Sequence, residues 1–170
     1  MVIEWLRRGV EITGRAVAWL TLAMVLVTFT VVVLRYGFNL GWIWVQETIT
    51  YLHAAVFMLA AAWTLQANAH VRVDVIYRDR SPRYKAWVNL LGTVFFILPF
   101  CAFLVWSGWD YVLRSWQVME GSREAGGLPL VYLLKTLILA LPALLLMQSV
   151  CQVAESVRCL GDRKAEGAGH

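Results

Sequence analysis

Four long runs of apolar residues, separated by shorter polar connections, divide this chain: residues 16–34, 48–68, 86–107 and 128–151. The first run holds nineteen residues without a charged side chain. As a helix it would be about 29 Å long, close to the thickness of the hydrocarbon core of a bilayer. The pattern therefore predicts an all-α membrane protein, with four transmembrane helices in a single domain over residues 1–152 and a cytoplasmic tail over residues 153–170.

Mixed segments adjoin these runs. Residues 1–15 place apolar and charged side chains on different helical faces, so a short interfacial helix is one interpretation and an extension of the first span is the other. Residues 111–119 could form another helix along the membrane surface. The pair Ser81-Pro82 is typical of a helix start, with serine at the N-cap and proline at the first helical position.

Two of the spans carry features that bear on helix packing. The second is rich in alanine, and small residues let helices approach closely in lipid, where packing drives association. We therefore expect this helix to face protein on at least one side. Pro99 lies inside the third span and predicts a kink there, because proline lacks the N–H that would bond to the preceding turn.

The distribution of basic residues predicts the topology. Five of the fifteen lysines and arginines lie between the second and third spans: Arg72, Arg78, Arg80, Arg83 and Lys85. Cytoplasmic connections carry an excess of basic residues, so this connection is placed inside the cell. Both termini then face the cytoplasm as well. The termini and this connection together hold eleven basic residues, against three on the far side: Arg35, Arg114 and Arg123.

The composition argues against several function classes. Hydrophobic residues make up 60% of the chain and charged residues only 15%, whereas soluble domains carry about 25% charged residues. The net charge of +4 does not indicate nucleic-acid binding, because the basic residues lie beside apolar runs as topology determinants do. The sequence shows no CxxC pair, P-loop or catalytic constellation. We expect no enzyme activity, no metal and no cofactor.

Two charged residues, Glu47 and Lys135, are candidates for a position within the membrane. Glu47 opens the second span, and Lys135 lies about two turns into the fourth, both in the outer half of the predicted bundle. A charged side chain in a membrane is costly and needs a partner. One hypothesis is that the two residues pair across their helices. The alternative is that each side chain reaches the interface separately.

Seven short motifs occur in order along the chain: Arg35-Tyr36-x-Phe38-Asn39, Trp44-x-x-Glu47, His70-Val-Arg-Val-Asp74, Ser81-Pro82-Arg83, Leu98-Pro99-Phe100, Ser115-Trp116 and Gly126-Gly-Leu-Pro129. Their order and spacing within a four-span chain carry more information than any one of them. Over about residues 16–152 the chain resembles the small membrane subunit of tripartite ATP-independent periplasmic (TRAP) transporters, the DctQ-like family.

This resemblance implies a three-component importer of organic acids in the bacterial inner membrane. A periplasmic substrate-binding protein captures the organic anion, and a large membrane subunit carries it together with sodium by an elevator-like motion. The small subunit would bind the large one as a scaffold, help dock the binding protein and contact phospholipids. Sodium would bind in the large subunit and not in this chain.

The motifs and the charged outer connection supply candidate residues for these contacts. Candidates for the interface with the large subunit, or for a buried pair, are Arg35, Tyr36, Trp44, Glu47 and Lys135. The cytoplasmic connection contributes the motif residues His70, Arg72 and Asp74. Candidates for contact with the periplasmic partner are Arg114, Ser115, Trp116, Glu120, Arg123 and Glu124.

Two other function classes stay open at this point. One is a membrane anchor of a respiratory enzyme that holds haem or quinone, although His53 and His70 lie about 25 Å apart on one helix and cannot ligate one haem from the same chain. The other is a small four-helix exporter that works as a dimer. Such an exporter usually needs a carboxylate in the first span, and residues 16–34 have none.

Overall fold

The computed structural model of this chain describes residues 2–67 and 80–167, with side chains over residues 3–67 and 80–161. Its helices are α1 (Val2–Gly37), α2 (Ile43–Gln66), α4 (Pro82–Gly92), the π-helical turn η1 (Thr93–Ile97), α5 (Leu98–Gln117) and α6 (Val131–Gly167). Since α4, η1 and α5 follow one another without a break, the described part of the chain has four rods long and apolar enough to cross a membrane. The predicted four-span, all-α fold is confirmed.

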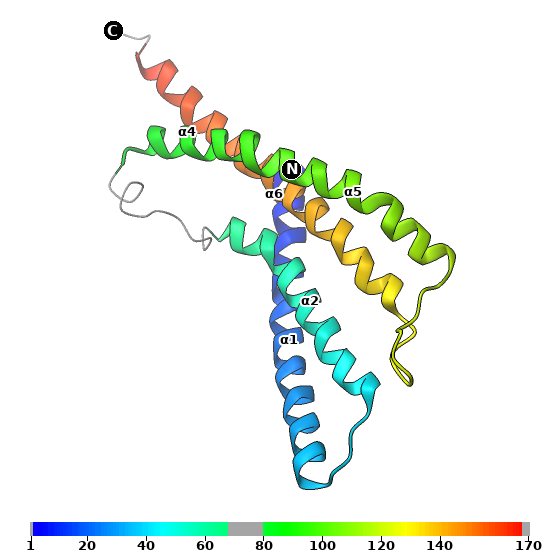
Figure 1. The fold of residues 1–170 in the computed structure, drawn as a ribbon. Helices are drawn as coiled ribbons and strands as arrows, with labels where there is room; N and C mark the ends of the chain where they lie inside the picture. The colour runs from blue at the N-terminus through cyan, green and yellow to red at the C-terminus, as the bar shows by residue number, and fades with distance from the viewer. Residues whose placement is uncertain (1, 68–79, 168–170) are drawn as a thin grey trace.

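The four rods form two hairpins that diverge from a common crossing (Figure 1). Helices α1 and α2 pack along each other, as do α5 and α6, and α6 also contacts α1, α2 and α4. Residues 38–42 connect α1 to α2, and residues 118–130 connect α5 to α6. We call the side on which these two connections lie the loop end. The opposite side, where α2 ends and α4 begins, is the terminal end.

The apolar core lies where the hairpins cross. It consists of Val10, Ala62, Leu65, Cys101 and Leu145, so each of the four rods contributes to it, the third through α5. Ala62 is 1% exposed. The expectation that the alanine-rich second span faces protein is met at this point, because Ala61 also packs against the cluster.

Two glycines set the closest approaches between helices. A Cβ atom at Gly14 of α1 would lie 2.3 Å from Cγ of Trp63 on α2. A Cβ atom at Gly108 of α5 would lie 2.9 Å from a methyl carbon of Ile138 on α6. In each hairpin, a bulky side chain of one helix therefore packs directly against a glycine of the other. Such close packing drives helix association in lipid, where there is no hydrophobic driving force between helices.

The expected disturbance at Pro99 takes the form of a π turn. Pro99 occupies the first turn of α5, immediately after η1. The Leu98 N–H bonds back to the carbonyl of Thr93, five residues earlier, instead of four. A π turn widens the helix by one residue, and here it lies directly before the residue that cannot donate a helical hydrogen bond.

In three segments the helices run on beyond the predicted spans. Residues 2–15 belong to α1, so the extension of the first span is the interpretation that holds and a separate interfacial helix is not formed there. Residues 111–117 likewise continue α5. The tail continues α6 to Gly167. Within this extension Ser156 is buried, and the thiol of Cys159 lies 4.0 Å from the Pro82 carbonyl oxygen of α4.

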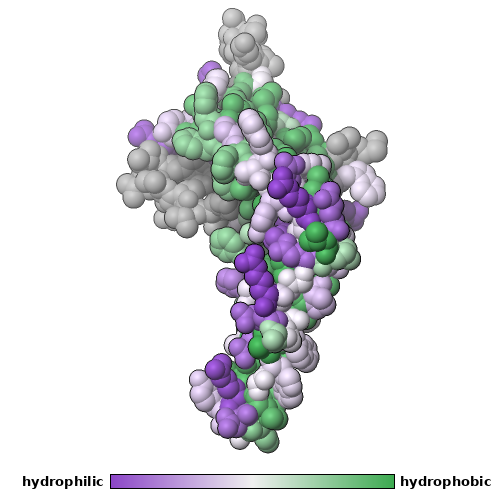
Figure 2. Space-filling view, turned by 45° about the vertical axis from the view of Figure 1, so that its right-hand side comes forward, coloured by the Kyte–Doolittle hydropathy of each residue, from purple (hydrophilic) through white to green (hydrophobic). Residues whose placement is uncertain are grey.

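Large apolar side chains cover much of the outer surface of the bundle. Phe29 is 66% exposed, Phe57 73% and Trp106 88%. The face in Figure 2 shows apolar side chains around the helix crossing and hydrophilic ones at the tip of the α1–α2 hairpin. Such an apolar surface is suited to contact with lipid or with another membrane protein.

The contact between Gly14 and Trp63 gives a direct test of this packing. Gly14→Ala places a methyl group inside the indole ring, so we expect the free energy of unfolding to fall by about 1–3 kcal/mol. Gly92→Ala is the matched control, since Gly92 is helical and has open space around its Cβ position. The measurement is equilibrium unfolding in mixed micelles followed by circular dichroism. Equal stability of the two variants would contradict the packing described here.

Candidate functional site

The connection between α5 and α6 folds back over the start of α2 and the start of α6. Its backbone is held partly by its own hydrogen bonds: the Glu120 N–H donates to the Ser115 carbonyl at 3.0 Å, and the Ser122 N–H donates to the Leu128 carbonyl at 2.9 Å. The remaining ties come from two ionisable side chains, Glu47 and Lys135. We call Glu47, Glu120, Ser122, Leu128 and Lys135 the loop-end cluster.

Glu47 holds the far side of this connection. The carboxylate lies in the second turn of α2 and accepts hydrogen bonds from the Ser122 hydroxyl and, at 2.6 Å, from the Leu128 N–H. Hydrogen bonds to a charged acceptor are roughly twice as strong as those between neutral groups. One carboxylate on α2 therefore fixes two points of the connection, which are six residues apart.

The glycine pair in this connection is explained by the same contact. Gly126 has a φ of +79°, a left-handed conformation that other residues adopt at a cost. A Cβ atom at Gly127 would lie 2.4 Å from the Ser122 hydroxyl oxygen and 2.8 Å from a carboxylate oxygen of Glu47. The first glycine makes the turn, and the second leaves room for the Glu47 carboxylate.

Lys135 holds the near side of the connection. Its Nζ lies 2.5 Å from Oε2 of Glu120 and 3.9 Å from the centre of the Tyr111 ring. The hydrogen bond from Lys135 lowers the pKa of the Glu120 carboxyl below its ordinary value. The ion pair is therefore fully formed at neutral pH, and its stabilisation is lost only as the pH falls through this lowered pKa.

An aromatic contact ties α5 to α6 beside this ion pair. The indole N–H of Trp116 donates to the Thr136 hydroxyl at 2.9 Å. Its ring meets that of Tyr132 edge to face, with the ring centres 4.7 Å apart. Ser115, the preceding residue, is 2% exposed. The Ser115-Trp116 motif thus fastens the end of α5 to the first turns of α6.

The structure gives Glu47 and Lys135 partners different from the pairing expected. Each side chain reaches the α5–α6 connection instead of the other, because that connection lies between them and offers Ser122, a backbone N–H and Glu120. Sequence reasoning did not single out Ser122, Tyr111 or Thr136. Only the glycine pair signalled that this connection packs closely on something.

The other predicted site residues are placed as follows. Arg114, Arg123 and Glu124 are exposed on α5 and the connection. Arg35, Tyr36 and Trp44 are exposed near the tip of the α1–α2 hairpin, and Trp44 lies about one turn before Glu47 on α2. His70, Arg72 and Asp74 lie outside the described residues. The predicted set is therefore split between an exposed hairpin tip and a braced, charged connection.

Over residues 2–67 and 80–167 no group of three His, Cys, Asp or Glu residues could hold a metal ion. What the loop-end cluster can do is mechanical and electrostatic. It fixes to two helices the backbone of a connection that carries exposed charges of both signs, Arg123 and Glu124. Such a surface is suited to binding another molecule.

Comparison with known proteins gives a family match and one curated relative. The model of the family described as "Tripartite ATP-independent periplasmic transporters, DctQ component" matches residues 24–159. The C4-dicarboxylate TRAP transporter small permease protein DctQ of Vibrio cholerae is 29% identical over 89 residues, which are 52% of this chain and 38% of that protein. The match thus spans well under half the length of this relative. No solved structure matches the chain.

The role of Glu47 can be tested by removing its charge. Glu47→Gln keeps the size of the side chain but weakens both hydrogen bonds to the connection. We expect the Leu128 amide to exchange with deuterium at least about tenfold faster, since a hydrogen bond to a charged acceptor contributes about 1.5–3 kcal/mol. Hydrogen exchange measured by mass spectrometry in nanodiscs reports this change. Glu124→Gln, at an exposed site in the same connection, is the control; the hypothesis is wrong if both variants exchange alike.

Proposed function

The chain belongs to the family of DctQ components of tripartite ATP-independent periplasmic transporters, and we propose that it is a scaffold that holds the large membrane subunit of such a transporter. The family model covers most of the chain, and its members are transporter components rather than enzymes. The chain is a multi-pass membrane protein. What it holds, and how, is argued from its surfaces.

The low number of ionisable groups in the spans supports holding rather than carrying. The apolar runs at residues 16–34 and 86–107 contain no charged residue. The other two runs contain one lysine, arginine, aspartate or glutamate between them, Lys135, and its ammonium is paired with Glu120 at the loop end. A carrier of ions or acids places polar coordinating groups near the middle of the bilayer. The coupling ion, which we propose to be sodium, and the organic acid would therefore bind in the large subunit.

Two surfaces are suited to the large subunit. The tip of the α1–α2 hairpin exposes Tyr36 by 83% and Trp44 by 50%. Beside it, an apolar groove of about 400 Å³ runs between α1, α2 and α6, lined by Leu20, Leu52 and Leu137 among others. The hydroxyl of Tyr51 is buried at this groove, and no residue in the described ranges 2–67 and 80–167 forms a hydrogen bond with it. A neighbouring membrane helix could fill the groove and supply the missing partner.

The single observation that carries the proposal for the periplasmic partner is the bracing of the α5–α6 connection. Its exposed charges, Arg114, Arg123 and Glu124, stand on a backbone fixed through Glu47 and Lys135. A preorganised surface loses little conformational entropy when it binds. We infer that this surface docks a periplasmic substrate-binding protein. The distribution of basic residues supports this inference, because it favours a topology with this connection on the periplasmic side of the bacterial inner membrane and both termini in the cytoplasm.

The scaffold role predicts that this chain co-purifies with a larger multi-span protein and transports nothing alone. The experiment is co-expression with a TRAP large membrane subunit and a periplasmic binding protein from the same genome, followed by affinity purification and uptake in liposomes. Labelled succinate is the first probe, with a panel of other carboxylates. We expect uptake only when all three components and a sodium gradient are present. Uptake by this polypeptide alone would overturn the scaffold role.

The docking surface predicts a separation between uptake and assembly. Reversing charge at Arg123 and Glu124 (Arg123→Glu with Glu124→Lys) should lower uptake about tenfold or more, because like charges then face each other across the interface. The membrane complex itself should still purify intact. Charge reversal at Arg158, which is exposed near the end of α6, is the control. Unchanged uptake in the double variant would remove this surface from the docking site.

A further inference from the structure

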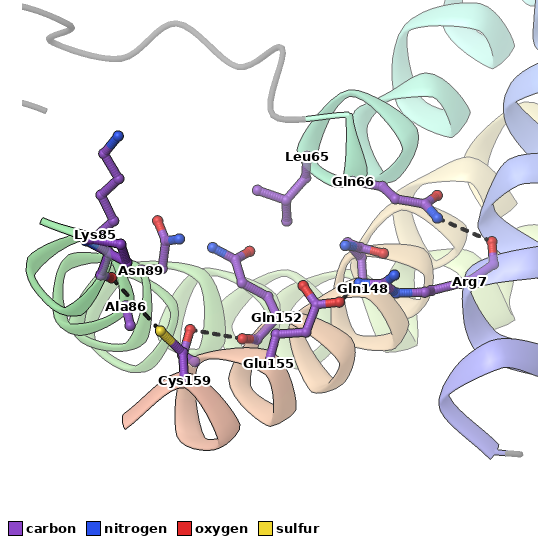
Figure 3. A pocket seen from close by; sticks show the side chains of 12 residues that line it. Arg7, Leu65, Gln66, Lys85, Ala86, Asn89, Gln148, Gln152, Glu155 and Cys159 are labelled. Atoms are coloured by element: carbon purple, nitrogen blue, oxygen red, sulfur yellow. Dashed lines mark hydrogen bonds and ion pairs between the residues drawn. The ribbon is translucent and has the colours of Figure 1, made fainter. Parts of the chain in front are cut away.

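A polar cleft of about 270 Å³ opens at the terminal end of the bundle, remote from the loop-end cluster (Figure 3). Its walls come from the first turns of α1, the end of α2, the start of α4 and the middle and later turns of α6, from Gln148 to Cys159. Such a cleft is unexpected in a chain with 60% hydrophobic residues. Figure 3 shows the amides of Asn89 on α4 and Gln152 on α6 facing the same open space.

The floor of the cleft is a polar stripe on α6. Gln148, Gln152, Glu155, Ser156 and Cys159 all line it. Their spacing of four, three, one and three residues puts them on one helical face. Gln148 follows the start of α6 by about 26 Å, so the stripe begins where a helix of this length leaves the hydrocarbon core of about 30 Å. The cleft therefore lies at the level of lipid headgroups.

Four polar atoms at this cleft have no hydrogen-bond partner in the described part of the chain. Three are amide oxygens, those of Gln66, Gln148 and Gln152, and the fourth is Nε of Arg7. Gln148 is only 4% exposed, so little bulk water reaches its amide. A buried polar atom without a partner costs about 1–3 kcal/mol. Three such oxygens at one cleft call for a hydrogen-bond donor from outside the described part of the chain.

The charges at the cleft define the rest of the ligand. Arg7 forms an ion pair with Glu155, which holds its guanidinium against the stripe while Nε stays unpaired. Gln66 donates to the backbone carbonyl of Arg7 at 3.4 Å, so the start of α1 is fixed in place. Lys85 adds a second basic group on the α4 wall. The ligand should carry both an acceptor anion for these cations and a donor for the amide oxygens.

An apolar groove adjoins the cleft and extends toward the hydrocarbon core. It has a volume of about 370 Å³ and is lined by Leu65, Phe96, Ile97, Phe100 and Leu145. Leu65 lines both the groove and the cleft. Phe96 belongs to the π turn η1 and is 76% exposed. A polar cleft that continues into an apolar groove has the form of a phospholipid site, whereas a free phosphate would need only the cleft.

We propose that the cleft binds the headgroup of phosphatidylethanolamine, with an acyl chain in the groove at Leu65 and Phe96. The phosphodiester lies against Arg7 and Lys85. The primary ammonium donates to the amide oxygens of Gln148 and Gln152. This lipid would anchor the terminal end of the bundle to the leaflet that contacts it.

The test uses the full-length chain in detergent with equimolar phosphatidylethanolamine and phosphatidylcholine, and native mass spectrometry to count bound lipids. The two lipids share phosphate and net charge, but the quaternary ammonium of choline has no N–H to donate. We expect about a fivefold or greater preference for phosphatidylethanolamine, the ratio that one net hydrogen bond gives. Gln148→Met and Gln152→Met should each reduce this preference toward one, and Gln148→Met should fold at least as stably as the parent chain.

Ser149→Ala is the matched control, since Ser149 is a buried and unpartnered polar residue on α6 that does not line the cleft. Its lipid preference should stay at the parent value. Phe96→Ser should weaken binding of the lipid but not of glycerophosphoethanolamine, which has no acyl chain. Equal retention of the two lipids, or equal behaviour of Gln148→Met and Ser149→Ala, would overturn the proposal. Preferential retention of phosphatidylglycerol would overturn the ethanolamine assignment, and equal competition by glycerophosphoethanolamine would exclude the groove.

Discussion

The structure of this chain follows from one constraint: inside a bilayer, a charged or hydrogen-bonding group finds no water. Glu47 and Lys135 stand near the loop end of two spans, and both are satisfied by the connection between α5 and α6. The bonds that satisfy these two charges are the same bonds that fix the connection. A rigid, charged surface at this end is therefore a consequence of keeping two ionisable residues in a membrane protein.

The same absence of water removes the hydrophobic drive for one helix to pack on another, so shape has to bring the helices together. Gly14 accepts Trp63, and Gly108 accepts Ile138, at separations that leave no room for a methyl group. The π turn before Pro99 widens the helical turn of the third rod beside the core, and Phe96 of this turn is exposed on the surface. The helix crossing is thus determined by a few glycines and one proline, more than by the number of large apolar residues.

The fold could be predicted from hydrophobic periodicity, because a span of about twenty apolar residues has few alternatives in a membrane. The helix ends could not, since the extensions of α1 and α6 bury side chains such as Val10 and Ser156 in the folded chain, and such burial is a tertiary property. For the site, sequence reasoning identified Glu47 and Lys135 as residues in need of partners. It could not identify Ser122 or Glu120 as those partners, because the return path of a thirteen-residue connection is a tertiary property.

The two ends of the bundle differ in how completely their polar groups are satisfied, and this difference indicates how the molecule is held. At the loop end the ties are internal, so a partner can dock there without breaking them. At the terminal end the amide oxygens of Gln66, Gln148 and Gln152 lie at a cleft and have no hydrogen-bond partner among the residues that the structure describes. Polar groups in a cleft at the headgroup level are completed most simply by the membrane itself. With the proposed lipid bound at one end and a preorganised surface at the other, such a bundle would be suited to staying in place while the proposed large subunit moves.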